Sequence, residues 1–218
     1  MLRVLEPEIM DDAEQALAYA RADFATSNQS FVDSLLADYS EPLLDVVDIG
    51  CGPCDVMVRL ARAQPSTRIT AVDGSAAMIE LGVQAVREVG LEARVTAMQG
   101  TIPGLALPER SFDAVVSKDL LHHLPDPAAL WSEARRLGRP GAILYVMDLI
   151  RPETQQDARA IVERVASNEH PILKQDFFNS LCAAFTIEEV KLQLQDAGLA
   201  LQVRCIGDRH MLIQGRLP

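Results

Sequence analysis

Apolar runs and amphipathic stretches alternate through the middle of the chain. The apolar runs predict strands over residues 45–49, 68–72, 93–98, 112–117 and 141–149. The stretches with helical spacing predict helices over residues 54–64, 75–89 and 127–137. This alternation is typical of an α/β fold, in which a parallel sheet has helices on both faces. Ligands of such sheets bind beyond the carboxyl ends of the strands, and four residues fall there: Gly50, Asp73, Gly100 and Ser117.

The pattern differs on either side of this region. Residues 8–37 have helical spacing, and we expect Ser27-Asn28 to break them into two helices. Residues 151–168 predict an amphipathic helix. Further on, Thr186 is expected to cap another helix, and residues 199–215 predict a closing antiparallel hairpin.

The segment Val46-Val47-Asp48-Ile49-Gly50-Cys51-Gly52-Pro53-Cys54 is the most informative part of the chain. It predicts a strand, then a glycine turn that opens a helix. Glycine at positions 50 and 52 lets the backbone approach a ligand where a β-carbon would collide. Asp73 follows Gly52 by 21 residues, at the end of the next apolar run, where an acid is placed to bind a ribose diol. The segment and Asp73 together indicate a cofactor that contains a nucleoside.

Two common nucleotide sites fit this loop poorly. A dinucleotide site expects a third glycine three residues after Gly52, but Asp55 stands there and would repel a pyrophosphate. The phosphate loop Gly-x-x-x-x-Gly-Lys-Ser/Thr is absent from the sequence. The remaining pattern, Asp48-x-Gly50-x-Gly52, resembles the first motif of class I S-adenosylmethionine-dependent methyltransferases. The cofactor of that family has no phosphate.

The resemblance continues over residues 46–149, and the core is most similar to methyltransferases of the ubiquinone and menaquinone type. Residues 71–79 resemble the second motif, in which an acid binds the ribose and a methionine region flanks the adenine. Residues 118–126 contain Leu-His-His-Leu-Pro-Asp, an element of small-molecule methyltransferases. Two positions depart from the family pattern. Cys54 replaces a usual third glycine, and Thr101 replaces the acid that usually binds the adenine amino group.

The resemblance implies a single Rossmann-like domain with a seven-stranded sheet, mostly parallel, with an antiparallel final strand and helices on both faces. Its implied parts are an N-terminal helical cap (1–40), a cofactor-binding core (45–149), a substrate-side insertion (150–185) and a closing helix and hairpin (186–218). The implied activity is methyl transfer from S-adenosyl-L-methionine to a small organic acceptor, at oxygen, nitrogen or carbon. The residues implied in cofactor binding are Tyr19, Asp48, Gly50, Cys51, Gly52, Asp73, Gly74, Met78, Gly100, Thr101, Ile102, Ser117 and Lys118.

Several of these residues also have a structural interpretation, which stays open at this point. Asp48 lies near the cofactor's amino group or only fixes the glycine loop. Asp73 binds the ribose or caps the helix that follows. Lys118 borders the sulfonium end or faces a lid or solvent. Tyr19 hydrogen-bonds the cofactor's carboxylate or only packs its helix.

His122 and His123 are the candidate catalytic residues, with His123 preferred. An imidazole with a pKa near neutrality can deprotonate a hydroxyl or an enol. The alternative is packing, because one of two adjacent residues usually faces the core. We expect the acceptor pocket between the N-terminal helices and residues 151–185, with these candidates: Asn28, Phe31, Asp148, Arg151, His170, Phe177, Phe178 and Asn179.

Two other functions remain open. The chain could bind the cofactor without turnover and act as a scaffold or regulator. Cys51-Gly52-Pro53-Cys54 is also the active-site tetrapeptide of thioredoxins, although an aromatic residue usually precedes the first cysteine there. We expect no metal, because Cys182 and Cys205 stand alone without a second metal-type pair.

Composition narrows the partners and the compartment. The chain has 20 basic and 31 acidic residues. Its net charge of −11 disfavours nucleic acid and an anionic membrane surface as partners. We expect neither a membrane span, because no apolar run reaches about 18 residues, nor a secretory signal. Four cysteines without framework spacing suit the cytoplasm, where we expect a monomer or homodimer.

Overall fold

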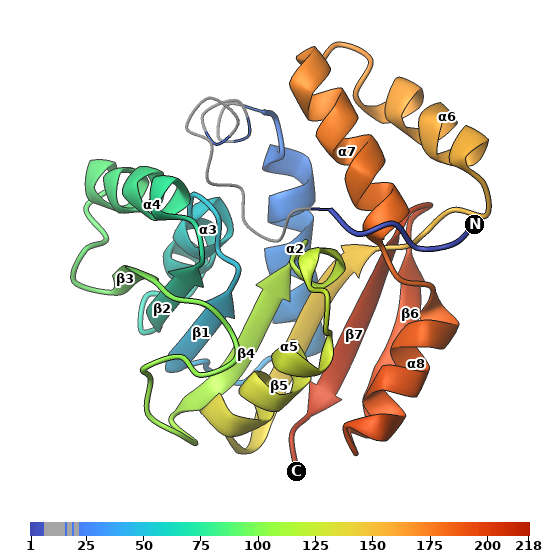
Figure 1. Cartoon of the computed structure of the whole chain (residues 1–218). Helices are drawn as coiled ribbons and strands as arrows, with labels where there is room; N and C mark the ends of the chain where they lie inside the picture. The colour runs from blue at the N-terminus through green and yellow to red at the C-terminus, as the bar shows by residue number, and fades with distance from the viewer. Residues whose placement is uncertain (7–15, 17–18, 20–21) are drawn as a thin grey trace.

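The computed structural model describes residues 1–6, 16, 19 and 22–218. Its centre is a seven-stranded sheet with the strand order β3-β2-β1-β4-β5-β7-β6 (Figure 1). Neighbouring strands from β3 to β5 run parallel, whereas β7 runs antiparallel to both β5 and β6. This confirms the expected Rossmann-like sheet. The strands are β1 (Asp45–Ile49), β2 (Arg68–Asp73), β3 (Val95–Gln99), β4 (Phe112–Lys118), β5 (Gly138–Leu149), β6 (Gln202–Ile206) and β7 (His210–Arg216).

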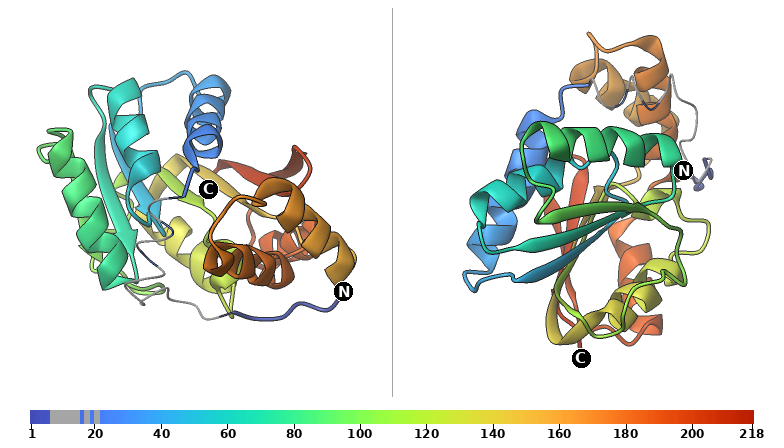
Figure 2. Two further views of the ribbon diagram at one scale, coloured as in Figure 1. Left: turned by 90° about the horizontal axis from the view of Figure 1, so that it is seen from above. Right: turned by 90° about the vertical axis from the view of Figure 1, so that its left-hand side faces the viewer.

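Alternate residues of the strands serve two apolar cores, one on each face of the sheet. Val46 belongs to the core that includes residues of α2 (Ala25–Asp38) and α3 (Asp55–Ala63), and α4 (Ala76–Glu88) adds Val86 to it. Its neighbour Val47 belongs to the core formed with α5 (Ala128–Leu137) and α8 (Ile187–Asp196). Because successive side chains of a strand point to opposite faces, this pattern produces the three layers that Figure 2 shows.

Two further helices, α6 (Gln155–Val165) and α7 (Pro171–Ala183), lie beyond the carboxyl end of β5 (Figure 1). They share a small apolar cluster with Leu149, the last residue of that strand. Residues 1–6 run beside them, and the amide of Val4 donates to the carbonyl of Cys182 at 3.0 Å. The amino terminus therefore contributes to the same end of the sheet as the glycine loop.

Local sequence explains where two helices begin. Thr154 accepts a hydrogen bond from the amide of Asp157, whose side chain accepts one from the amide of Thr154. Thr186 and Glu189 make the same reciprocal pair at the start of α8, which confirms the expected cap. Because Thr154 is the capping residue, α6 begins at Gln155 and not at residue 151 as expected.

Two expectations for the helices were wrong. Ser27 and Asn28 do not break a helix, because both lie inside α2, and the Asn28 amide donates to Asp55 Oδ2 at 2.9 Å. A helix was not expected after Pro171, yet α7 begins there, since the first position of a helix needs no amide hydrogen. Residues 7–15, 17–18 and 20–21 of the predicted stretch 8–37 lie outside the described part. Within the described part, no helix has the length and apolar character needed to cross a membrane.

Candidate functional site

The loop after β1 is tightly packed because Gly50 has no side chain. Gly50 has a φ of 81°, and a β-carbon there would lie 2.9 Å from the β-carbon of Leu120. The amides of Gly50 and Cys51 donate to the carbonyl of Val72 at 2.8 and 2.9 Å. The loop therefore folds back over the end of β2, and its residues line a space above the sheet.

That space is a cavity of about 840 Å³ at the carboxyl ends of β1, β2 and β4. Its volume falls within the range of roughly 300–1,000 Å³ that is typical of ligand sites. The structure brings most of the expected cofactor residues to its walls: Tyr19, Asp48, Gly50, Cys51, Gly52, Asp73, Gly74, Met78, Gly100, Thr101, Ile102 and Lys118. Ser117 lies beneath them, fully buried, and its hydroxyl donates to the carbonyl of Ile49 at 2.7 Å. It joins β4 to β1 below the cavity.

Asp73 connects the glycine loop to the start of α4. Its Oδ2 accepts from the amide of Gly52 at 2.8 Å, and its Oδ1 accepts from the amide of Ser75 at 2.9 Å. Burial raises the pKa of Asp73 although these amides oppose the shift. Ser75, not Asp73, caps α4, because its hydroxyl accepts from the amide of Met78. A carboxylate accepts up to about four hydrogen bonds, so Asp73 retains capacity for the hydroxyls of a ligand.

Asp48 is a second acid on the cavity wall. It is 4% exposed and follows Val47 near the end of β1. Burial, and then the nearby charge of Asp73, raise the pKa of Asp48 to about 8, whereas Lys118 acts in the opposite direction. A buried carboxyl of this kind is stabilised when a cation enters its site. The two acids of the cavity, Asp48 and Asp73, therefore suit a ligand that has both hydroxyls and a positive charge.

Lys118 and Asp119 form an ion pair at the end of β4. The Lys118 side chain is only 8% exposed, so it does not face solvent. Burial would raise the pKa of Asp119, but Lys118 and His210 outweigh it and lower that pKa to about 2. Asp119 lines the cavity with a φ of 58°, and the sequence did not indicate this residue. Its left-handed backbone has no signal of the kind that glycine gives.

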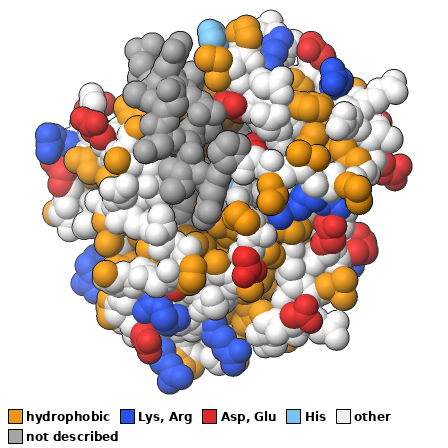
Figure 3. Space-filling model, viewed as in Figure 1, with side chains coloured by type: hydrophobic (Ala, Val, Ile, Leu, Met, Phe, Trp, Pro, Cys, Tyr) orange, Lys and Arg blue, Asp and Glu red, His pale blue; other side chains and the backbone are white. Residues whose placement is uncertain are grey.

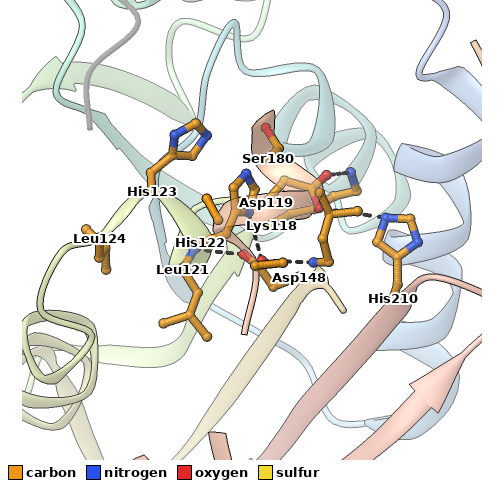
Figure 4. A network of polar contacts seen from close by, with 12 residues as sticks. Lys118, Asp119, Leu121, His122, His123, Leu124, Asp148, Ser180 and His210 are labelled. Carbon is orange, nitrogen blue, oxygen red and sulfur yellow. Dashed lines mark hydrogen bonds and ion pairs between the residues drawn. The ribbon is translucent and has the colours of Figure 1, made fainter. Parts of the chain in front are cut away.

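The two adjacent histidines have different surroundings (Figure 4). His122 is 2% exposed, and its Nδ1 lies 2.7 Å from Asp148 Oδ1. Burial lowers the pKa of His122, but Asp148, Glu6 and Asp119 together raise it by more, so the net shift is upward. His123 instead lines the cavity, and its Nδ1 lies 3.3 Å from Glu6 Oε1. Of the two candidates, His123 is therefore the one placed to meet a ligand.

Tyr19 lies on the cavity wall close to the glycine loop. A β-carbon at Gly52 would lie 3.9 Å from its ring, and the ring centroid is 4.8 Å from that of Phe24. Burial raises the pKa of the Tyr19 hydroxyl, and Asp119 and Asp73 add to the shift. The hydroxyl thus stays protonated at neutral pH and can donate a hydrogen bond.

Comparison with known proteins agrees with this geometry. A family model described as "Methyltransferase domain" matches residues 47–146, which contain the glycine loop, Asp73 and both histidines. A structure of a SAM-dependent methyltransferase from Aquifex aeolicus superposes with a TM-score of 0.72 at 18% identity, covering 95% of this chain and 99% of that one. Residues 47–146 are therefore a methyltransferase domain, of the class I S-adenosylmethionine-dependent kind.

Two curated relatives extend the match in sequence. The chain is 27% identical over 154 residues to 27-O-demethylrifamycin SV methyltransferase of Amycolatopsis mediterranei, and the match covers 71% of this chain and 53% of the relative. It is 33% identical over 108 residues to demethylmenaquinone methyltransferase of Porphyromonas gingivalis, which covers 49% of this chain and 44% of the relative. The chain spans about half the length of the curated relatives it matches.

Cys54 stands where the family usually has a third glycine, and its side chain fits because a small residue lies opposite it in α4. Cys54 has a φ of 64° and is fully buried. A β-carbon at Gly82 of α4 would lie 2.7 Å from Cys54 Sγ, so the absent side chain of Gly82 makes room for the thiol. Cys51 Sγ lies 3.7 Å from Cys54 Sγ. Its hydrogen bond with Cys54 and its burial raise the pKa of Cys51, whereas a reactive thiol needs a lowered pKa.

The residues expected around the acceptor lie mostly outside the cavity. Asn28 lines it. Phe31 is buried in the core, with its ring centroid 5.4 Å from that of Tyr145. Arg151 pairs with Glu189 at 2.6 Å. The remaining candidates have other roles: Asp148 binds His122, His170 caps α7, Phe177 and Phe178 pack on the cluster at Leu149, and Asn179 accepts from Gln175.

Proposed function

We propose that the chain transfers the methyl group of S-adenosylmethionine to a small organic acceptor. The observation that carries this proposal is the placing of two acids, Asp48 and Asp73, beside a glycine loop in one cavity. The volume of about 840 Å³ leaves room for an acceptor beside the cofactor. The two curated relatives are named for methylation of a demethylrifamycin and of demethylmenaquinone, which favours a small organic acceptor here as well.

Each wall residue has a role in this proposal. Asp73 accepts hydrogen bonds from the ribose hydroxyls, and Asp48 balances the positive charge of the cofactor's amino acid end. Gly50 and Gly52 let the backbone lie against that end. The adenine takes the part of the cavity beside Met78 and Thr101, both of which line it.

When bound, the cofactor supplies a methyl group on a positively charged sulfur. The contribution of the chain is then to align donor and acceptor and to exclude water. The ion pair of Lys118 and Asp119 closes the wall at the end of β4. Where the acceptor has a proton to lose, His123 is placed to take part, because it lines the cavity and His122 does not.

Calorimetry with S-adenosylmethionine and, separately, with NAD tests the cofactor. We expect binding of the first and none of the second. The Asp73→Ala variant should bind S-adenosylmethionine at least about 10-fold more weakly, since it lacks a carboxylate that makes charge-assisted hydrogen bonds of about 1.5–3 kcal/mol each. Binding of NAD alone would overturn the proposal.

Turnover requires a separate assay, because a regulator could bind the cofactor without using it. Release of S-adenosylhomocysteine is measured against a panel of small hydroxyl, quinol and amine compounds. We expect release with at least one class of acceptor. Tight cofactor binding with no release from the whole panel would favour the regulator.

A further inference from the structure

Glu6, His122 and His123 bring three potential metal ligands together, and His123 among them lines the cavity. One ligand atom from each lies within 4.8 Å of the other two. Glu6 Oε1 is 3.6 Å from His122 Nε2 and 3.3 Å from His123 Nδ1. In a tetrahedral site with metal–ligand bonds of about 2.0–2.1 Å, neighbouring ligand atoms lie about 3.3 Å apart. The two distances from Glu6 Oε1 are therefore close to the edges of such a site.

The carboxylate of Glu6 supports this interpretation independently. Its side chain is only 8% exposed, although glutamate side chains usually lie at the surface. Oε2 accepts from the Ser180 hydroxyl at 3.4 Å, but Oε1 has no hydrogen-bond donor in the part of the chain that the structure describes. Buried carboxylate oxygens nearly always have a partner, and a metal ion would satisfy this one.

Asp148 orients His122 in the way that metal-binding proteins orient their histidines. Its Oδ1 lies 2.7 Å from His122 Nδ1, and its Oδ2 accepts from the amide of Leu121 at 2.7 Å (Figure 4). With Nδ1 bound to a carboxylate, Nε2 is the nitrogen that faces Glu6. A carboxylate behind a ligating histidine fixes its tautomer and raises its basicity.

We propose that Glu6, His122 and His123 bind a divalent transition-metal ion, and Zn²⁺ is the ion that we expect. Two imidazoles and one carboxylate suit zinc, whereas Mg²⁺ and Ca²⁺ prefer oxygen ligands. Three protein ligands leave a fourth position, as in catalytic zinc sites. Because His123 lines the cavity, our proposal places that position on the side of the cavity, where an acceptor can reach it.

The use of the fourth position rests on the proposed function. An acceptor hydroxyl would bind there, and the metal would lower its pKa. The hydroxyl proton leaves to water. The oxygen then forms a bond to the methyl carbon as the carbon–sulfur bond breaks, and the electron pair of that bond stays on sulfur. The site therefore points to a hydroxylated small molecule as the acceptor class.

Metal binding by the purified full chain, without S-adenosylmethionine, is the direct test. We expect one Zn²⁺ per chain by elemental analysis. After replacement of zinc by Co²⁺, we expect visible bands of cobalt with nitrogen and oxygen ligands. Bands from thiolate ligands are not expected, because Cys51 and Cys54 are not part of the site.

Variants identify the ligands. His123→Ala and Glu6→Gln should each weaken Zn²⁺ binding roughly 100-fold or more, beyond the roughly 10–100-fold typical of changes behind a ligand. His170→Asn is the matched control, because His170 is exposed and asparagine also caps helices. It should bind Zn²⁺ like the parent chain. Circular dichroism and a melting curve establish that each variant is folded, and Glu6→Gln decides the test if His123→Ala does not fold.

Equal Zn²⁺ affinity in the parent chain and the Glu6→Gln variant would overturn the inference, and so would cobalt bands from thiolates. Calorimetry with S-adenosylmethionine on the same proteins separates the two proposals. Loss of metal binding with intact cofactor binding identifies the metal ligands. A parent chain that binds the cofactor but no metal overturns this inference alone, whereas one that binds metal but no cofactor overturns the proposed function alone.

Discussion

The two sides of the cavity are built in different ways. The side with Asp48 and Asp73 comes from consecutive elements, β1 to α4, and depends on backbone conformations such as the φ of 81° at Gly50. The side with His123 comes from the residues after β4, and it depends on the contact of His123 with the buried carboxylate of Glu6 from the amino terminus. A continuous motif therefore forms the first side, which the proposed function assigns to the cofactor and which we call the cofactor side. Tertiary packing alone forms the second, which the proposed function assigns to the acceptor and which we call the acceptor side.

The largest expected effect concerns the charge of Asp48. Its pKa is about 8 in the folded chain and 3.8 for the free side chain. The folded state therefore keeps a proton that the unfolded state loses, so stability falls as the pH rises from about 4 to about 8. Since one pKa unit is about 1.4 kcal/mol, the loss reaches at most about 6 kcal/mol. Asp48→Asn should remove this fall and make the cofactor-free chain more stable at pH 8.

Urea unfolding between pH 5 and pH 9 measures this effect in the parent chain and the variant. The same variant should be more stable but bind the cofactor less tightly. Calorimetry should therefore show weaker binding of S-adenosylmethionine by Asp48→Asn than by the parent chain. If the free energy of unfolding depended on pH in the same way in both proteins, the pKa of Asp48 would not be raised in the folded chain.

On the acceptor side, removal of His122 should cost about 3–5 kcal/mol of folding stability. His122→Ala leaves the buried carboxylate of Asp148 without its charged partner, which is the costly way to break a buried pair. His123→Ala should cost less than about 1 kcal/mol, because that side chain is 20% exposed and lies on the cavity wall. Denaturant unfolding of both variants checks the difference, and equal losses would contradict the assigned surroundings.

On the cofactor side, Gly50→Ala should cost about 2–4 kcal/mol, since it combines left-handed backbone strain with a clash against Leu120. It should also abolish measurable binding of S-adenosylmethionine. Gly90→Ala is the control, because Gly90 has a φ of 69° but no neighbour within 4 Å of its β-carbon position. It should cost only about 1–2 kcal/mol, for the strain alone. Equal costs would show that the contact with Leu120 is unimportant.

The smallest expected effect concerns the thiols and leaves stability unchanged. Cys205 is exposed, whereas Cys51 and Cys54 are buried and the pKa of Cys51 is raised. Thiol labelling followed by mass spectrometry should therefore modify Cys205 first. Rapid labelling of Cys51 would revive the thioredoxin-like interpretation of this tetrapeptide.

The sequence predicted the cofactor side well, because its signals are local. An apolar run placed β1 over residues 45–49, and Gly50 and Gly52 marked the turn that follows. Whether these residues bind the cofactor stays a prediction. The acceptor side had no comparable signal. Nothing near Glu6 in the sequence indicates that it meets two histidines, and Asp119 adopts a φ of 58° without a glycine.

The same limit applies to the helices. Thr186 gave the start of α8 correctly, because a capping box is a four-residue pattern. Asn28 was wrongly expected to help break a helix, since it lies inside α2 and its partner is Asp55 on α3.

The acidic composition does not translate into a uniformly acidic surface. On the face in Figure 3, basic side chains are interspersed with acidic and apolar ones.

The attachment of residues 1–6 affects how the molecule comes apart. Arg3 donates to the carbonyls of His122 and Leu124 at 2.8 and 2.9 Å, and its guanidinium lies 3.8 Å from the ring centroid of Phe185. These partners are far along the chain, so the contacts close a long loop and bear its entropy cost. We therefore expect this segment to detach at denaturant concentrations that leave the sheet intact. Glu6 would leave with it. The acceptor side would then lose the contact between Glu6 and His123, while the cofactor side with Asp48 and Asp73 stays folded.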